Sequence, residues 1–202
     1  MTYIAAILVG YLLGCSNMAL YISRAKGVDL RSGGSGNLGA SNTVTMIGWG
    51  AGVITGLHDI GKSVLAVLLA KFLFPQAEYI GVTAGVACIF GHMYPFYLKF
   101  RGGKGFASYV GALLALNWKF GLVIVILIAI VALITDFIVA GTTLTMLTAP
   151  VYMGLTVGLV AALLFAAASA VILWKHRENY VRMCNGTEYG VRGGQHGFRW
   201  RK

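Results

Sequence analysis

The sequence predicts an all-α integral membrane protein with seven transmembrane helices, its amino terminus outside and its carboxyl terminus cytoplasmic. Three observations predict this fold. First, 58% of the residues are hydrophobic and only 11% are charged, which leaves too little polar surface for a shell facing water. Second, several apolar stretches approach the roughly 20 residues that a helix needs to cross a bilayer. Third, basic residues gather in alternate loops, as in membrane proteins of fixed orientation.

The apolar stretches give the expected helices in chain order. They cover residues 3–22, 57–74, 79–98, 105–117, 120–134, 137–153 and 155–174. The first stretch lacks a basic leader and a convincing cleavage site, so we expect it to stay as a helix. Residues 1–184 would then form one membrane domain. The polar residues 185–202 would form a flexible cytoplasmic tail.

Basic residues follow the first, third and seventh expected helices. They are Arg24, Lys26, Arg31, Lys99, Arg101, Lys104, Lys175, Arg177 and Arg182. Cytoplasmic loops carry an excess of lysine and arginine, so all three loops are expected on the cytoplasmic side. The net charge of +10 is compatible with binding to nucleic acid, anionic lipid or an anionic substrate. Part of this charge is explained by the basic loops that set the orientation in the membrane.

The sequence does not support a disulfide-rich protein, a metalloprotein, a dinucleotide-binding fold or an ATPase. Cys15, Cys88 and Cys184 lie in or beside expected helices without ligand spacing, so neither a disulfide framework nor a metal site is expected. Residues 34–39 match G-x-G-x-x-G, but no buried strand precedes them and no βαβ unit surrounds them. Residues 56–63 match the Walker A pattern inside a run that must be helical in lipid. These contexts argue against a dinucleotide fold and an ATPase.

The first glycine-rich segment, residues 31–42 (RSGGSGNLGASN), is a candidate anion-binding loop. Its glycines leave successive main-chain N–H groups uncovered, and such groups can converge on an anion at a helix start. Ser35 and Asn37 add side-chain donors. A flexible connector is the alternative interpretation of this segment taken alone.

The segment of residues 91–105 (GHMYPFYLKFRGGKG) holds a second candidate anion-binding loop. The glycines beside Lys104 are Gly102, Gly103 and Gly105. They put a strong cation where the backbone can approach a ligand closely. His92 lies at the inner end of the third expected helix, where it is a candidate for catalysis, although a hydrogen-bonded structural role is more common for such a histidine.

Two polar pairs with a spacing of three complete the pattern. Asp59 and Lys62 share a helical face, and the favoured interpretation is that they neutralise each other. The alternatives are that they orient the neighbouring loops or bring a cation to a substrate. His176 and Asn179 share one side of a continuing helix. A juxtamembrane cluster that binds lipid headgroups is the alternative for the second pair.

Taken together, these segments resemble the bacterial acyl-phosphate glycerol-3-phosphate acyltransferases, the PlsY family. SGNLGASN (35–42) is similar to that family's first motif, DIGK (59–62) to its second and GHMYPFYLKFRGGKG (91–105) to its third. HREN (176–179) and NGTE (185–188) look like its carboxyl-terminal segment. The match keeps the order of the motifs over nearly the whole chain up to Glu188. One departure is that Thr43, Val44, Thr45 and Met46 stand where the family commonly carries an arginine.

The resemblance implies a multi-pass enzyme of the plasma membrane, the inner membrane of the cell, whose active site faces the cytoplasm. It would transfer a fatty acyl group from acyl phosphate to the 1-hydroxyl of glycerol 3-phosphate, giving lysophosphatidic acid and phosphate, the first step of phospholipid synthesis. No cofactor, metal or thioester donor is implied. The expected partners are the two substrates and the bilayer, without nucleic acid, and the protein would be a monomer. A transporter or flippase of phosphorylated metabolites is the alternative, disfavoured because the polar groups cluster at one membrane face.

The residues and the resemblance together give the candidate site. Those expected to act in catalysis are Ser35, Lys104, His92, His176 and Asn179. Those expected to bind substrate phosphate are Gly34, Ser35, Gly36, Asn37, Gly39, Asn42, Gly102, Gly103, Lys104 and Gly105. The second tier comprises Asp59, Lys62, Arg101 and Thr142. Acyl phosphate is already activated, so no enzyme nucleophile is required. The base for the hydroxyl proton stays open between His92, His176 and an oxygen of the substrate phosphate, which we favour.

Overall fold

The computed structural model describes residues 1–193 and 195–196, and the chain forms two compact units, Met1–Gly121 and Leu122–Lys202. Over the described residues the secondary structure is helical apart from one short pair of strands. The all-α class is therefore confirmed, whereas the strand pair was not predicted. Residues 194 and 197–202 of the expected flexible tail lie outside the described residues.

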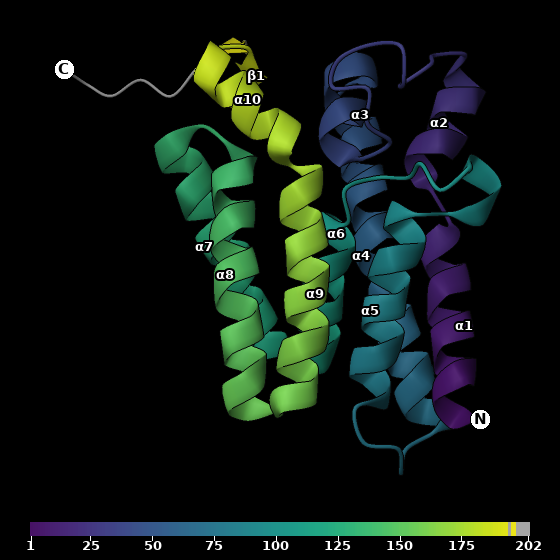
Figure 1. Ribbon diagram of the computed structural model, residues 1–202. Helices are drawn as coiled ribbons and strands as arrows, with labels where there is room; N and C mark the ends of the chain where they lie inside the picture. Colours follow the sequence, from purple (N-terminus) through teal and green to yellow (C-terminus); the bar gives the residue numbers. More distant parts are fainter. Residues whose placement is uncertain (194, 197–202) are drawn as a thin grey trace. The chain divides into compact units, whose positions relative to one another are not determined.

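Membrane-length helices and short connecting helices build the first unit. They are α1 (Thr2–Cys15), α2 (Met18–Lys26), α3 (Ala40–Ile47), α4 (Trp49–Leu73), α5 (Ile80–Met93), the 3-10 helix η1 (Phe96–Leu98) and α6 (Phe106–Leu116). Helices α1 and α4 pack against α5, and α6 packs against both α4 and α5 (Figure 1). The short helix α3 was not predicted, because it continues directly from the glycine-rich segment.

Glycines set the close approach of these helices. A Cβ on Gly14 of α1 would overlap the main-chain carbonyl of Cys88 on α5, and a Cβ on Gly111 of α6 would overlap that of Ile60 on α4. Small residues let helix backbones approach closely where lipid supplies no hydrophobic driving force between helices. The close packing of α5 holds its carboxyl-terminal end, which carries His92, between α1 and α4.

The first membrane span breaks between α1 and α2. Ser16 and Asn17 leave the helical conformation, and the Asn17 side chain accepts a hydrogen bond from the Leu20 amide at 2.9 Å to start α2. Non-helical backbone at membrane depth needs protein partners. The Cys15 carbonyl accepts from the Tyr97 hydroxyl at 2.7 Å. The break therefore exposes main-chain carbonyls to polar side chains of other helices.

The second unit contains the remaining elements, with α7 running into it from the end of the first. They are α7 (Trp118–Thr135), α8 (Ile138–Thr156), α9 (Leu159–Lys175), α10 (Arg177–Asn185), β1 (Glu188–Tyr189) and β2 (Gln195–His196). Helices α8 and α9 pack together, and α9 and α10 meet at a bend of 40°. The strands β1 and β2 are antiparallel, with Glu188 opposite His196.

Among the described residues, five helical segments are long and apolar enough to cross a membrane, and the bent pair α9 and α10 raises this number to six. The five are Thr2–Lys26, Trp49–Leu73, Ile80–Leu98, Trp118–Thr135 and Ile138–Thr156. The fourth expected helix, residues 105–117, corresponds to α6, which has 11 residues. An α-helix of that length spans only roughly 16 Å, about half of a hydrocarbon core. Length alone thus supports fewer than seven spans.

Candidate functional site

Asn42 holds the first glycine-rich loop in a defined conformation. Its side-chain oxygen accepts a hydrogen bond from the Ser35 amide at 2.7 Å, and its side-chain nitrogen donates to the Leu30 carbonyl at 2.7 Å. Asn42 is buried. Gly34 and Gly36 have φ angles of +57° and +66°, a left-handed conformation that glycine adopts without strain. Asn42 is one of the residues expected to bind substrate phosphate, and the structure shows that its side chain also shapes the loop.

The third segment folds back on the end of α5. The amides of Gly102 and Gly103 donate to the carbonyls of Met93 and His92, both at 3.1 Å. A Cβ on Gly103 would overlap the imidazole of His92 and would lie 2.9 Å from the Leu38 carbonyl oxygen. Only glycine fits this position, because the loop backbone passes directly against the histidine ring.

The first and third segments meet in a contact that we call the loop junction, made by Arg31 with Arg101 and by Leu38 with Gly103. The guanidinium of Arg31 donates to the Arg101 carbonyl at 2.8 Å. The Leu38 carbonyl lies beside Gly103, as described above. The structure therefore brings the two predicted anion-binding loops together within the first unit. Lys104 follows this junction, half-buried, immediately before Gly105, which has a φ of +93° and precedes α6.

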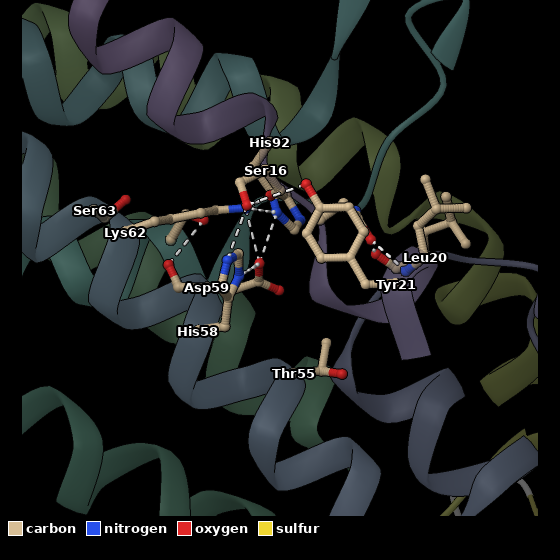
Figure 2. Close-up of polar contacts among 12 residues, drawn as sticks. Ser16, Leu20, Tyr21, Thr55, His58, Asp59, Lys62, Ser63 and His92 are labelled. Atoms are coloured by element: carbon tan, nitrogen blue, oxygen red, sulfur yellow. Dashed lines mark hydrogen bonds and ion pairs between the residues drawn. The ribbon is translucent and has the colours of Figure 1, made fainter. Parts of the chain in front are cut away.

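His92 also belongs to a polar cluster, which consists of Ser16, His58, Asp59, Lys62 and His92 (Figure 2). Asp59, Lys62 and His92 are buried, and Ser16 and His58 are half-buried. The Lys62 ammonium lies 2.8 Å from the Asp59 carboxylate and 2.8 Å from Nδ1 of His92. It also donates to the Ser16 carbonyl at 2.7 Å. His92 Nδ1 is 3.2 Å from the same Asp59 oxygen. The predicted pairing of Asp59 with Lys62 is present, and it includes a histidine that the sequence spacing did not connect to it.

Ser16 and His58 are members of the cluster that sequence reasoning missed. The Ser16 hydroxyl lies 3.0 Å from Nε2 of His58 and 3.4 Å from the Tyr21 hydroxyl. The available signal was the adjacent polar pair Ser16 and Asn17 inside the apolar run of residues 3–22. Polar groups at membrane depth are costly and therefore mark breaks and functional sites.

The other predicted site residues belong to the second unit. His176 is buried at the bend between α9 and α10, and its Nδ1 lies 2.8 Å from the Ile172 carbonyl. Thr142 is also buried, and its hydroxyl donates to the Ile138 carbonyl of its own helix at 3.2 Å. The neighbouring Thr143 hydroxyl lies 2.7 Å from the Tyr180 hydroxyl.

Glu188 of β1 holds Asn179 in place. The Asn179 amide donates to one carboxylate oxygen of Glu188 at 2.6 Å, and Nε of Arg182 donates to the other at 2.6 Å. Glu188 is buried. This carboxylate was not among the predicted site residues, although it lies in the NGTE segment that the family resemblance had marked. Residues at the start of the expected tail thus contact a predicted site residue.

Known proteins are similar to this chain over nearly its full length. The family model described as glycerol-3-phosphate acyltransferase matches residues 4–186. Glycerol-3-phosphate acyltransferase 1 of Oceanobacillus iheyensis is 34% identical over 196 residues, covering 93% of this chain and 94% of that protein. The protein of the same name from Deinococcus radiodurans is 37% identical over 197 residues, covering 93% and 95%.

Two solved structures are also similar. The crystal structure of PlsY (YgiH), an integral membrane glycerol 3-phosphate acyltransferase, in its glycerol 3-phosphate form has a TM-score of 0.87 and 28% identity, covering 95% of this chain and 96% of that one. The lysophosphatidic acid form of PlsY has a TM-score of 0.84 and 26% identity, covering 96% and 98%. The fold is therefore that of an integral membrane protein.

Proposed function

The chain belongs to the glycerol-3-phosphate acyltransferase family, and on this premise we propose that it takes its acyl group from an acyl phosphate and transfers it to the 1-hydroxyl of glycerol 3-phosphate. It is an acyltransferase of phospholipid synthesis. Similar structures occur in a glycerol 3-phosphate form and a lysophosphatidic acid form, which supports these two molecules as the acceptor and the product of this chain.

The loop junction is the observation that carries the site proposal. Two glycine-rich loops, separated by 70 residues at the Arg31 and Arg101 contact, meet in one unit. Both substrates are phosphate-bearing anions, and a hydroxyl donor together with a cation stabilises negative charge on a phosphate. Ser35 and Lys104 flank this region, so we assign them to the substrate phosphates.

The reaction needs no covalent enzyme intermediate. The 1-hydroxyl oxygen of glycerol 3-phosphate attacks the acyl carbon, a new ester bond forms, and the bond from that carbon to the phosphate oxygen breaks. The hydroxyl proton passes to a phosphate oxygen, and inorganic phosphate leaves. The protein contributes by holding the two reactants in line and by stabilising the charge on the departing phosphate. The family resemblance makes His176 and Asn179 of the second unit further candidates for a role in the reaction.

We place the active site on the cytoplasmic face of the plasma membrane. The Arg31 bond supports this, because it joins the basic loop after the first span to the basic loop after the third, and basic loops stay in the cytoplasm. Seven crossings, with α6 as a short one and α9 and α10 as a bent one, put the amino terminus outside and the carboxyl terminus inside. The enzyme works as a monomer in the bilayer.

An assay with purified protein in detergent tests this function. Acyl phosphate and glycerol 3-phosphate should give lysophosphatidic acid and one phosphate per ester, whereas an acyl thioester should give neither. Ester formation from the thioester would overturn the donor assignment. Uptake of glycerol 3-phosphate into vesicles without ester formation would favour a transporter.

Single substitutions test the site. Ser35→Ala and Lys104→Ala should each lower turnover by roughly 100-fold or more, the range seen when one donor to a developing charge is lost. Ser32→Ala and Lys26→Ala are matched controls on exposed positions of the same region. Equal turnover of the control and site variants would contradict the assignment.

A further inference from the structure

The surroundings of the Lys62 ammonium fix the protonation of His92. A lysine ammonium has three N–H donors and no acceptor. Three acceptor groups lie within hydrogen-bond distance of it: the Ser16 carbonyl at 2.7 Å, the Asp59 carboxylate at 2.8 Å and Nδ1 of His92 at 2.8 Å. Two N–H donors do not approach each other to 2.8 Å. Nδ1 of His92 therefore accepts a hydrogen bond from Lys62 through its lone pair.

The competing arrangement is a hydrogen bond from a protonated Nδ1 of His92 to Asp59. That distance is 3.2 Å, longer than either of the Lys62 contacts with these two residues. Charge-assisted N–H to carboxylate bonds are typically shorter, at about 2.7–2.9 Å. The shorter contact favours Lys62 as the hydrogen-bond donor to Nδ1 of His92, while the Lys62 ammonium and the Asp59 carboxylate form an ion pair. Asp59 then acts on His92 indirectly, by holding the ammonium in place.

A neutral imidazole carries one proton, so an accepting Nδ1 puts the proton on Nε2. The Nε2 edge of His92 faces Gly103, where an added Cβ would overlap it, and the Leu38 carbonyl lies on the same side. This edge therefore lies against Gly103 of the loop junction, while Nδ1 faces Lys62 and Asp59 of the polar cluster (Figure 2).

We propose that Lys62 is a positioning residue that locks His92 as the Nε2–H tautomer, so that His92 serves the acyl transfer as a hydrogen-bond donor and not as its general base. The proposal rests on the proposed function and deepens it. A base needs an unprotonated nitrogen within reach of the substrate hydroxyl. The unprotonated nitrogen of His92 is held by Lys62 inside the protein. The Nε2–H group instead lies at the loop junction, against Gly103, which leaves the substrate phosphate to take the proton.

Nitrogen NMR of protein labelled with ¹⁵N-histidine tests the tautomer without any turnover. The chain has four histidines, and the His92 signals are identified by their loss in His92→Gln. In the wild-type protein His92 should be neutral and protonated on Nε2. In Lys62→Met the population protonated on Nδ1 should rise, because Asp59 becomes the partner that faces Nδ1. A wild-type His92 protonated on Nδ1 would overturn the proposal.

Lys62→Met leaves a buried carboxylate unpaired and can fail to fold. The double variant Asp59→Leu with Lys62→Met is the second test, because it removes both charges and fills the same space with apolar side chains. His92 should lose its fixed tautomer there as well. A purely structural ion pair would lower the melting temperature in these variants and leave the tautomer unchanged, which would contradict the positioning role.

Turnover of two amide variants gives the second readout. The glutamine amide nitrogen reaches the position of Nε2, whereas the asparagine amide reaches that of Nδ1. His92→Gln should therefore stay within about tenfold of the wild-type kcat, the worth of one imperfect hydrogen bond, while His92→Asn and His92→Ala should fall roughly 100-fold or more. Equal losses in all three would support a base and overturn the donor role. If the wild type makes no lysophosphatidic acid from acyl phosphate, the proposed function fails while the tautomer measurement still stands.

Discussion

The Arg31 guanidinium donates a hydrogen bond to the main-chain carbonyl of Arg101 at 2.8 Å. This single bond ties the glycine-rich loop before α3 to the basic loop that follows η1. Arg31 is exposed, and its partner is a backbone atom. The bond therefore depends on the position of the two loops and not on the identity of the residue at position 101.

Breaking this bond should loosen the site without unfolding the protein. Arg31→Ala should raise the KM for glycerol 3-phosphate severalfold, because an exposed hydrogen bond from a charged donor contributes about 1 kcal/mol or somewhat more. The melting temperature should change little. Lys26→Ala removes another exposed cation of the same region and is the control for lost charge. Steady-state kinetics that show equal KM values for the two variants would contradict a role for the loop contact.

Asn42 should be essential for the shape of the first loop. Asn42→Ala leaves the Ser35 amide and the Leu30 carbonyl without the partner that each has at 2.7 Å. Each unsatisfied buried group costs about 1–3 kcal/mol, so a clear drop in melting temperature and in turnover is expected. Ser41→Ala, at the exposed neighbouring position, should leave both unchanged. Thermal unfolding in detergent measures the difference, and an unaltered Asn42→Ala protein would refute it.

Gly103 should not tolerate a methyl group. Gly103→Ala would press its Cβ against the His92 ring and the Leu38 carbonyl, and overpacking of this kind costs about 1–3 kcal/mol. Turnover should fall because both Lys104 and His92 would shift. Gly61→Ala is the matched control, since a Cβ there meets nothing within 4 Å and alanine favours a helix interior by about 0.5–1 kcal/mol. The two variants should move the melting temperature in opposite directions; a shift in the same direction would argue against the close contact.

Glu188 should stabilise the second unit through its two charge-assisted partners. Glu188→Gln keeps the shape of the side chain but weakens the bonds from Asn179 and Arg182, both 2.6 Å long. Hydrogen bonds to charged groups contribute about 1.5–3 kcal/mol, so a lower melting temperature is expected. Glu178→Gln is the control, because it breaks an exposed ion pair with Arg177 at 3.8 Å. Exposed ion pairs contribute only about 0–1 kcal/mol to stability. Equal melting temperatures for the two variants would show that the Glu188 contacts do not stabilise the fold.

The membrane helices were predictable where apolar residues ran without interruption. The expected helix at residues 120–134 corresponds to α7 (Trp118–Thr135), because its composition leaves no alternative to a lipid-facing helix. The start of α4 at Trp49 was missed by eight residues, since the glycines before Leu57 dilute the hydropathy without breaking the helix. The short α3 gave no apolar signal of its own.

The candidate site was predictable in its residue types but not in its contacts. The glycines around Lys104 indicated a close backbone approach, and Gly103 makes one with His92. The spacing of Asp59 and Lys62 indicated an ion pair, and they form one at 2.8 Å. Sequence spacing contains no information on residues 30 or more positions away, so the link from Lys62 to His92 and to the Ser16 carbonyl could not be foreseen.

The sequence by itself determined that the protein lies in a membrane, that it is helical and which functional groups its loops carry. Hydropathy, glycine content and charge are properties of the local sequence and do not depend on tertiary contacts. Only the tertiary structure decided which polar atoms meet. The break of the first span at Ser16, the return of Gly103 onto His92 and the three acceptors around Lys62 all depend on how α1, α4 and α5 pack. Hydrogen bonds need their two atoms within about 3 Å, and that distance is set by packing between helices and not by order along the chain.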